Sequence, residues 1–499
     1  MSHFTLSAVN FSWLPILPLG AIALGAMAIM LIGPGVDDED SAGLGVIALI
    51  TLLVAFVFAL FTLGENTLAF GGSLVTDDYA GFFEIVIVIA AALTVAMSLD
   101  YVADEGMAGA EYYSLILFAA FGMMLMAAAG DLIIIFIGLE TMSLAVYALA
   151  GFMRRDPRSN EAALKYFVLG AFSTGFLLYG IALVYGATGT ISLAAIRAAL
   201  SARMAANPLL LLGLGMMLIG FGFKVAAVPF HMWTPDAYEG APTPVTAFMA
   251  VGVKLAAFAG FMRVFMVNLG PVSAQWTMVL WVVAALSMTV GNLAALVQQS
   301  LKRMLAYSAI AHAGYLLLGM AASPQPLAGG AMLYYLIGYS FTNLGAFAVV
   351  IAVERKGSGG ANLRDFQGLA RARPGLAVAM ALFMLSLMGV PPLAGFVGKF
   401  YLFSAALSAG LVWLVIIAAL NSAISVYYYA RVIVAMYAQE ESAAPARIVA
   451  RPGLILSVIA GVAGTILVGL YPQPWIGAAS SAYASALGRP NAKVAANYR

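Results

Sequence analysis

Five ionisable side chains stand inside long apolar runs of the sequence. They are Glu140 in FIGLETMSL, Lys165 in EAALKYFVLG, Lys224 in GFGFKVAAVPF, Lys254 in AVGVKLAAF and Lys399 in GFVGKFYLF. If such a run crosses a lipid bilayer, a charge near its centre costs about 2.5–3.5 kcal/mol, so a purely structural segment avoids one. Burial favours the neutral form of these groups and a nearby opposite charge favours the ionised form, so a group held between the two influences exchanges protons readily. The pattern therefore predicts a proton relay, in which Glu140 pairs with Lys224 at rest.

Two histidines accompany these groups. Lys224 and His231 are seven residues apart, so we expect them on nearly the same helical face, where they face the same cavity. His312 lies within the apolar run AYSAIAHAGYLL, where it is either a relay member or a hydrogen-bonded core residue. Lys165 also has two interpretations, because Glu161 stands four residues before it and the two side chains can pair on a helix surface.

Prolines interrupt two of the runs that carry these groups. Pro229 follows Lys224, and Pro391 with Pro392 precedes Lys399. Proline removes a backbone donor and frees a carbonyl group, and freed carbonyls that line a cavity in a membrane can hold water. Both runs are therefore predicted to form discontinuous helices.

The composition indicates an integral membrane protein. Of 499 residues, 63% are hydrophobic and 9% are charged, whereas soluble domains carry about 25% charged residues. The net charge of +1 offers no basic surface for nucleic acid. The chain has no cysteine and only three histidines, so we expect it to hold neither an iron–sulfur cluster nor a haem.

Apolar runs of about 20 residues can cross a bilayer as helices, and the sequence contains fourteen. They cover residues 12–33, 43–64, 80–99, 112–129, 131–153, 162–186, 209–231, 244–267, 276–298, 303–321, 330–353, 376–407, 411–438 and 453–471. The predicted fold class is all-α, with the seventh and twelfth helices discontinuous.

Basic residues gather in loops that alternate along these helices. They are Arg154, Arg155, Arg158, Lys302, Arg303, the run 355–373, Arg447 and Arg451. Because short cytoplasmic loops carry an excess of Lys and Arg, we expect both termini on the outer side of a bacterial inner membrane.

The sequence also contains a faint internal repeat. ALKYFVLG at 163–170 aligns with AMLYYLIG at 331–338, on the predicted sixth and eleventh helices. Helices five positions apart run in opposite directions, as in transporters with inverted repeats. We therefore divide the chain into three N-terminal helices (1–111), a first repeat (112–267), a second repeat (276–438) and a last helix with a tail (439–499). Leu333 takes the place of Lys165 in the second repeat, which leaves its proton uptake route open.

Two motifs carry a family resemblance. The segment 223–248, FKVAAVPFHMWTPDAYEGAPTPVTAF, closely resembles the signature of the antiporter-like membrane subunits of respiratory complex I. Its PDAYEGAPTP run, at 235–244, resembles the subunit N branch of that family more than the L and M branches. The segment 389–400, GVPPLAGFVGKF, is similar to the family's twelfth-helix motif, and the long C-terminal lateral helix of subunit L is absent from the sequence. The resemblance covers the fourteen-helix core.

The resemblance implies a proton-translocating subunit in the membrane arm of NADH:quinone oxidoreductase. It implies no cofactor in this chain, and FMN, iron–sulfur clusters and quinone in partner subunits that perform the redox chemistry. The implied partners are K-like and M-like membrane subunits, the lipid bilayer and, indirectly, the peripheral arm. By motif, Glu140 is the fifth-helix carboxylate, Lys224 its partner and Lys254 the central lysine. Lys399 then exchanges protons with the outside, and Lys165 modulates the pair.

Two alternatives remain open at this point. A subunit of a multi-subunit sodium/proton antiporter shares this fold and this pattern of Lys and Glu, although the DAYEG stretch argues against it. A purely structural membrane scaffold is the alternative from another class. It predicts that Lys224→Met leaves turnover intact.

Overall fold

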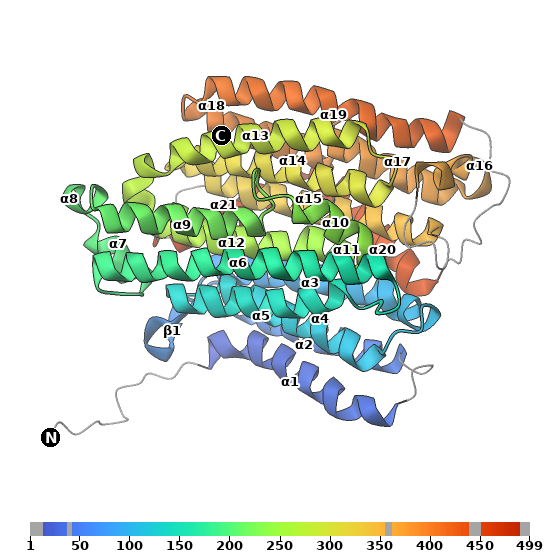
Figure 1. Ribbon diagram of the computed structural model, residues 1–499, viewed down its shortest axis with the longest axis horizontal. Coiled ribbons are helices and arrows are strands. Elements are labelled where there is room, and N and C mark those ends of the chain that lie inside the picture. Colours follow the sequence, from blue (N-terminus) through green and yellow to red (C-terminus); the bar gives the residue numbers. More distant parts are fainter. Residues whose placement is uncertain (1–12, 37–41, 355–361, 439–450, 490–499) are drawn as a thin grey trace.

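The computed structural model describes residues 13–36, 42–354, 362–438 and 451–489. Both chain ends, which we expect on the outer side, and the basic residue Arg447 lie outside the described residues. The described chain forms a bundle of long helices that lie side by side, with α1 at one edge and α18 and α19 at the opposite edge (Figure 1).

The N-terminal part contains three long helices and a small hairpin. The helices are α1 (Leu17–Ile32), α2 (Ala42–Phe61) and α3 (Asp78–Asp104), with short turns η2 (Leu14–Ile16) and η3 (Gly33–Gly35) beside α1. Between α2 and α3, strands β1 (Thr67–Ala69) and β2 (Leu74–Thr76) pair antiparallel around the turn η5 (Phe70–Gly72). The sequence analysis did not predict this hairpin, because strands of three residues show no usable alternation.

The next part of the chain runs from α4 to a long composite helix. Its elements are α4 (Gly109–Ala127), α5 (Leu132–Ala150), α6 (Pro157–Thr188), the short α7 (Leu193–Ala199) and α8 (Ala202–Ala205), α9 (Pro208–Lys224) and α10 (Trp233–Gly240). The composite helix Thr243–Asn268 follows, built from α11 (Thr243–Phe248), the π-helix η6 (Met249–Val253), α12 (Lys254–Phe261) and the π-helix η7 (Met262–Asn268). π-helical turns are rare in proteins as a whole, but those that do occur are often found at functional sites.

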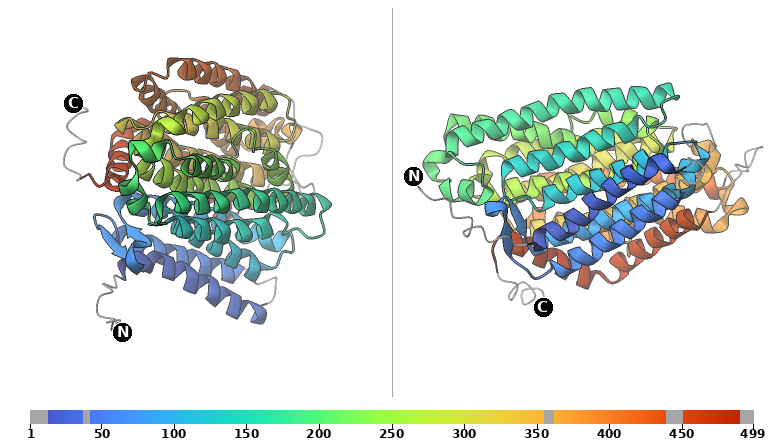
Figure 2. Two further views of the ribbon diagram at one scale, coloured as in Figure 1. Left: turned by 60° about the vertical axis from the view of Figure 1, so that its left-hand side comes forward. Right: turned by 90° about the horizontal axis from the view of Figure 1, so that it is seen from below.

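The remaining described elements complete the bundle. The elements are η8 (Gly270–Gln275), α13 (Thr277–Leu296), α14 (Leu301–Ala321), α15 (Pro326–Val353), η9 (Leu363–Phe366), α16 (Leu369–Ala372), α17 (Pro374–Met388), α18 (Ala394–Ser408), α19 (Val412–Ala438), α20 (Pro452–Leu470) and α21 (Pro472–Ala486). Helix α21 occupies a segment that we had assigned to the tail. Helices α20 and α21 return across the bundle and pack against α3 and α15, and Figure 2 shows the last helices beside the first ones.

The predicted membrane spans are confirmed. Twelve helices within the described residues are long and apolar enough to cross a membrane. The two remaining crossings are the predicted discontinuous helices. Helix α9 ends at Lys224 and α10 begins at Trp233, while α17 ends at Met388 and α18 begins at Ala394.

Polar side chains fix where several of these helices begin. Asp77 accepts a hydrogen bond from the Ala80 amide at the start of α3, and Asp131 accepts one from the Ile134 amide at the start of α5. Each carboxylate satisfies an amide that has no partner inside its helix.

The core lies along three central helices. In the most apolar stretch of each helix we compare the share of residues that are buried. This share is 100% for the composite helix Thr243–Asn268, 94% for α14 and 89% for α15, whereas it is only 33% for α6. Large apolar side chains on α1, α2, α6, α13 and α19 remain exposed, and in a membrane they face lipid or other subunits. The buried charges must therefore be sought around the composite helix, α14 and α15.

Candidate functional site

Lys224 stands at the end of α9 among aromatic rings. Its side chain is 2% exposed, and Nζ donates to the Tyr147 hydroxyl at 3.3 Å. Nζ also lies 5.0 Å from the ring centroid of Tyr147 and 5.1 Å from that of Tyr166. Ring faces attract a desolvated ammonium by about 2 kcal/mol, so this site stabilises a charge that apolar burial alone would reject.

Glu140 lies on α5 and acts electrostatically on both Lys224 and Tyr147. Its Oε1 is buried and has no hydrogen-bond partner. Within the described residues no ion pair of 4.0 Å or less joins Glu140 to Lys224. The resting pair expected from the sequence is therefore a longer-range interaction, with the Tyr147 hydroxyl as the direct partner of the ammonium.

Lys165 is ion-paired at the surface of α6. Its Nζ lies 2.6 Å from Glu161 Oε1 and 2.8 Å from Asp236 Oδ2, and its side chain is 44% exposed. Asp236 also accepts a hydrogen bond from Arg303 at 2.8 Å. The surface pairing considered from the sequence is present, and Asp236 extends it from α6 through α10 to α14.

Lys254 follows directly after the π-helix η6. It is 3% exposed, and its Nζ donates to the Ala309 carbonyl of α14. Nζ lies 5.3 Å from the ring centroid of Tyr339, whose hydroxyl is buried without a hydrogen-bond partner. Lys254 thus connects the composite helix to α14 and α15.

His312 lies on α14 between two lysines. Its Nδ1 is 2.5 Å from the Tyr335 hydroxyl, and its Nε2 is 3.1 Å from the Tyr429 hydroxyl. Lys254 and Lys399 are the charged residues that act on it electrostatically. The histidine is hydrogen-bonded in the core, and it also lies within electrostatic reach of both lysines.

Lys399 on α18 is held by the break before its helix. Its Nζ donates to the Leu387 and Met388 carbonyls, both at 2.9 Å, and to the Ser422 hydroxyl at 3.0 Å. The last carbonyls of a helix have no partner inside it, and α17 ends at Met388. The interruption therefore supplies ligands for the ammonium, where the sequence predicted only water.

His231 does not share a helical face with Lys224, so that prediction is wrong. Helix α9 ends at Lys224, and Ala226 adopts a positive φ of 61° in the turn that follows. His231 lies in this turn and is half-buried, and its Nδ1 has no hydrogen-bond partner. The structure gives it no contact with the other candidate groups.

The structure reveals two charged clusters that the sequence analysis missed. Arg263 donates to both carboxylate oxygens of Asp77, at 2.9 and 2.8 Å, and Glu84 is buried nearby on α3 at 3% exposure. Arg263 and Asp77 are 186 positions apart, so no local spacing could pair them.

The second cluster surrounds Lys302, which we had used only to orient the chain. Lys302 is 1% exposed and donates to the Ala241 carbonyl at 2.8 Å, and Glu354 and Glu239 act on it electrostatically. Lys302 belongs to α14, and its ammonium contacts the junction between α10 and α11. The sequence features that could have indicated this cluster are two acidic residues, Glu239 and Glu354. Of these, Glu239 belongs to the PDAYEG run.

The described residues contain no group of three or more His, Cys, Asp or Glu side chains placed to hold a metal ion. What the candidate site offers is a set of buried or partly buried ionisable groups, and its lysines and His312 each lie beside at least one tyrosine. It begins at Glu140 and Lys224, continues through Lys254 and His312, and ends at Lys399.

Comparisons with known proteins find similar sequences over most of the chain. The sequence profile of the family described as NADH:quinone oxidoreductase/Mrp antiporter, TM, matches residues 129–425. The NADH-quinone oxidoreductase subunit N of Trichlorobacter lovleyi is 49% identical over 462 residues, which cover 92% of this chain and 94% of that protein.

Solved structures show the same architecture. A chain of respiratory complex I from Thermus thermophilus with bound aureothin is 37% identical, with a TM-score of 0.80, over 93% of this chain and 99% of that chain. A chain of the Mrp complex from Dietzia is 22% identical, with a TM-score of 0.81, over 96% of this chain and 98% of that chain. This second match shows likeness of fold alone.

Proposed function

Because the chain belongs to the subunit N family of NADH-quinone oxidoreductases, we propose that it translocates protons through Glu140, Lys224, Lys254, His312 and Lys399. The chain is a multi-pass membrane subunit of a translocase complex, and it has no cysteine and no redox centre of its own. The observation that carries the proposal is the burial of three lysines at 2–4% exposure, each with direct polar partners. Charges buried in this way within a membrane mark ion pathways.

The tyrosines divide this pathway into steps. The Tyr147 hydroxyl contacts Lys224, so a proton can pass between them, either directly or through a bridging water. Lys254 meets Tyr339, and His312 bonds Tyr335 and Tyr429. Each protonation makes a neighbouring cation less favourable, so a charge change at one group shifts the next. Such a chain passes an electrostatic signal along the membrane and ends at Lys399, the group that exchanges with the outside.

We propose Lys165 and His231 as supporting residues, and the structure offers more support for Lys165 than for His231. Lys165 contacts Asp236 beside the α9–α10 break, so it is placed to modulate the field at Lys224. His231 has only its position in that break to support a role.

The redox groups are assigned to partner subunits. We place FMN, iron–sulfur clusters and quinone there, with K-like and M-like membrane subunits as neighbours and the peripheral arm as the distant electron donor. The exposed apolar faces of α6, α13 and α19 suit such neighbours and lipid.

The membrane orientation and the division into repeats also belong to the proposal. We place the chain in the bacterial inner membrane with both termini on the periplasmic side, since basic loops mark the cytoplasmic face. Inverted repeats at 112–267 and 276–438 are supported by the two breaks, which fall in corresponding helices before Trp233 and before Ala394. The N-terminal unit is 1–111 and the C-terminal unit 439–499.

The sodium/proton antiporter is the weaker alternative. The relative that covers 92% of this chain at 49% identity is an oxidoreductase subunit N, whereas the Mrp structure shares 22% identity.

Purification of the tagged chain from its native membrane in mild detergent separates the two assignments. We expect NADH:quinone reductase activity, flavin and iron–sulfur absorbance, and oxidoreductase subunits among the co-purifying polypeptides. A complex that contains only cofactor-free hydrophobic subunits and exchanges sodium for protons would overturn the proposal.

A further inference from the structure

The break between α17 and α18 leaves the last carbonyls of α17 to be satisfied by groups outside that helix. Backbone amides of the following turn bond the carbonyls of Leu385 and Ser386. The carbonyls of Leu387 and Met388 accept from the Lys399 ammonium instead, both at 2.9 Å. Of the four carbonyls that a helix end leaves without a partner, two are therefore capped by the turn and two face a cation.

A third oxygen completes the set around this ammonium. The Ser422 hydroxyl on α19 accepts from Lys399 Nζ at 3.0 Å, and it donates its own hydrogen to the Met388 carbonyl at 3.3 Å. A lysine ammonium has three donors, and here all three are used by oxygens. The site is thus a cluster of three uncharged oxygen ligands filled by one cation.

The counter-charge of the site comes from partial charges alone. Within the described part of the chain no ion pair of 4.0 Å or less involves Lys399. The carbonyl end of a helix carries about −0.5 elementary charge, and the ring centroid of Tyr315 lies 5.1 Å from Nζ. Both features attract a cation of any chemistry, so nothing in the ligand set itself is specific for a lysine.

The stem of Lys399 occupies the space beside the turn. Gly389 has a positive φ of 91°, and a Cβ added there would lie 3.1 Å from Lys399 Cδ. Glycine adopts such a φ readily and allows this close approach. A shorter side chain at position 399 would therefore open space next to the oxygens without removing any of them.

Oxygens of this kind bind alkali cations elsewhere. The carbonyl ends of half-helices coordinate sodium in transporters with broken helices, and backbone carbonyls replace the hydration shell of potassium in channel filters. An ammonium ion and a potassium ion have nearly the same size. We propose that the carbonyls of Leu387 and Met388 and the Ser422 hydroxyl form a site for a potassium-sized monovalent cation, which Lys399 fills and so closes to alkali cations. The inference rests on the proposed function, which gives Lys399 its access to the outer side.

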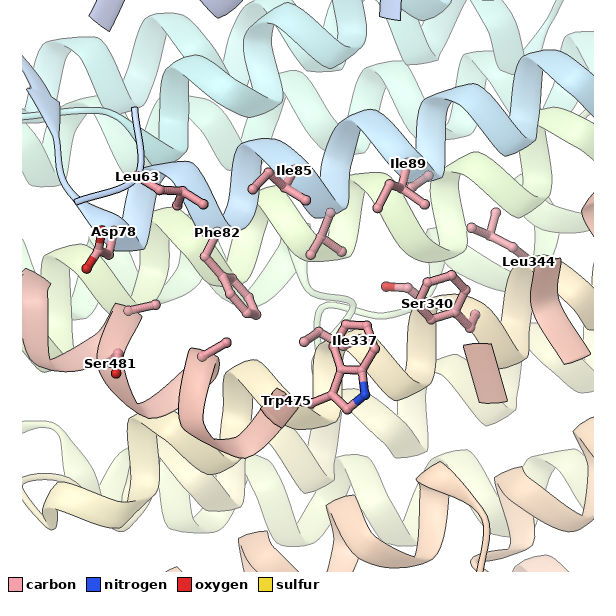
Figure 3. A pocket seen from close by; sticks show the side chains of 15 residues that line it. Leu63, Asp78, Phe82, Ile85, Ile89, Ile337, Ser340, Leu344, Trp475 and Ser481 are labelled. Atoms are coloured by element: carbon pink, nitrogen blue, oxygen red, sulfur yellow. The ribbon is translucent and has the colours of Figure 1, made fainter. Parts of the chain in front are cut away.

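The choice of probe follows from a second space in the described chain. A groove between α3, α15 and α21 has mostly apolar walls, with Asp78 and Ser481 at one end and Ile89 and Leu344 toward the other (Figure 3). Organic cations with apolar groups also adsorb to such walls, so they would not report on the oxygen site alone. Rubidium resembles potassium and has no apolar surface, and it is therefore the probe.

Binding of radioactive rubidium to the purified complete complex tests the site. Lys399→Ala removes the ammonium and opens the space, whereas Lys399→Met removes the ammonium and keeps the space filled. We expect Lys399→Ala to bind one more rubidium ion per complex than the parent or Lys399→Met. Lys399→Ser, which adds a hydroxyl oxygen, is the second open variant and should bind the extra ion too. Absence of the extra ion in both open variants, or its presence in Lys399→Met, would overturn the proposal.

Two further variants test the ligand set. Ser422→Ala, combined with Lys399→Ala, removes one oxygen and should weaken rubidium binding at least fivefold. Lys254 is the matched control, because its ammonium donates to a single oxygen within the described residues, the Ala309 carbonyl. Lys254→Ala should therefore bind no additional rubidium. Equal rubidium binding in Lys254→Ala and Lys399→Ala would contradict a role for the three oxygens.

Competition tests the size of the ion, and proton translocation separates this inference from the proposed function. Potassium and ammonium should displace the extra rubidium at concentrations at least tenfold lower than sodium, and equal displacement by sodium would overturn the size assignment. If Lys399→Ala translocates protons at the parental ratio to NADH, the proposed function fails. If it loses translocation and binds no extra rubidium, the proposed function stands and only the cation site is refuted.

Discussion

Replacement of Tyr147 by Phe removes the hydroxyl that Lys224 contacts and keeps the ring. In the structure this hydroxyl is the direct hydrogen-bond partner of the Lys224 ammonium at 3.3 Å, and Glu140 is not within ion-pair distance. The ring itself continues to face Nζ at about the observed 5.0 Å. The variant therefore removes the hydrogen bond to the Lys224 ammonium, together with a contact of the hydroxyl with Ser143, and keeps the ring.

The magnitude follows from that hydrogen bond. A hydrogen bond to a charged group contributes about 1.5–3 kcal/mol, and about 1.4 kcal/mol corresponds to a tenfold change in an equilibrium. We expect the ratio of protonated to neutral Lys224 at rest to fall by about ten- to a hundredfold in Tyr147→Phe. If proton transfer passes through this group, the rate of NADH-driven proton uptake should fall by a similar factor.

Tyr166→Phe is the matched control. Lys224 lies 5.1 Å from the Tyr166 ring centroid, but the Tyr166 hydroxyl is buried without a hydrogen-bond partner. The assay is proton uptake per NADH oxidised in proteoliposomes that contain the intact complex, with subunit content measured in parallel. Tyr166→Phe should pump within twofold of the parental complex. Equal pumping by Tyr147→Phe and the parent, or equal losses in both variants, would refute the reasoning.

Further predictions concern groups around the relay. His312→Phe removes both tyrosine hydrogen bonds, so pumping should fall at least tenfold in the same assay, whereas His231→Phe should stay within twofold; the reverse order would contradict the assignment. Asp77→Asn leaves Arg263 buried without its counter-charge, so we expect a loss of about 3–5 kcal/mol of stability. This loss should be detected as a lower Tm of the purified complex. An unchanged Tm would show that the pair is dispensable. Lys165→Gln breaks exposed ion pairs worth about 0–1 kcal/mol each, so its Tm should match that of the parent, and a large drop would indicate a buried role.

The helices were predictable because a helix that spans the bilayer requires a simple property of the sequence, which is a long apolar run. About 20 consecutive apolar residues satisfy it, and this run length is visible without any knowledge of packing. The breaks after Lys224 and before Lys399 were predictable for a similar reason, since proline cannot donate within a helix. Hydropathy does not distinguish π-helical from α-helical backbone, so the turns on either side of α12 were not foreseen.

The partners of the buried lysines were not predictable. Tyr147, Tyr339 and Tyr429 stand in apolar runs where a tyrosine reads as an ordinary core residue. Their roles depend on which helices lie side by side, as when α14 brings His312 to Tyr429, 117 positions away. The mistake over His231 has a local cause, because the helix ends at Lys224 rather than at Pro229.

The most direct test of the central claim uses the three buried lysines of the proposed relay. Lys224→Met, Lys254→Met and Lys399→Met remove the titratable group and keep most of the side-chain volume. Each complex is reconstituted, and the ratio of protons translocated to NADH oxidised is measured, with assembly checked by subunit composition. We predict assembled complexes in which this ratio falls for every variant, because each lysine belongs to one relay. Assembled complexes that translocate protons at the parental ratio would contradict the account.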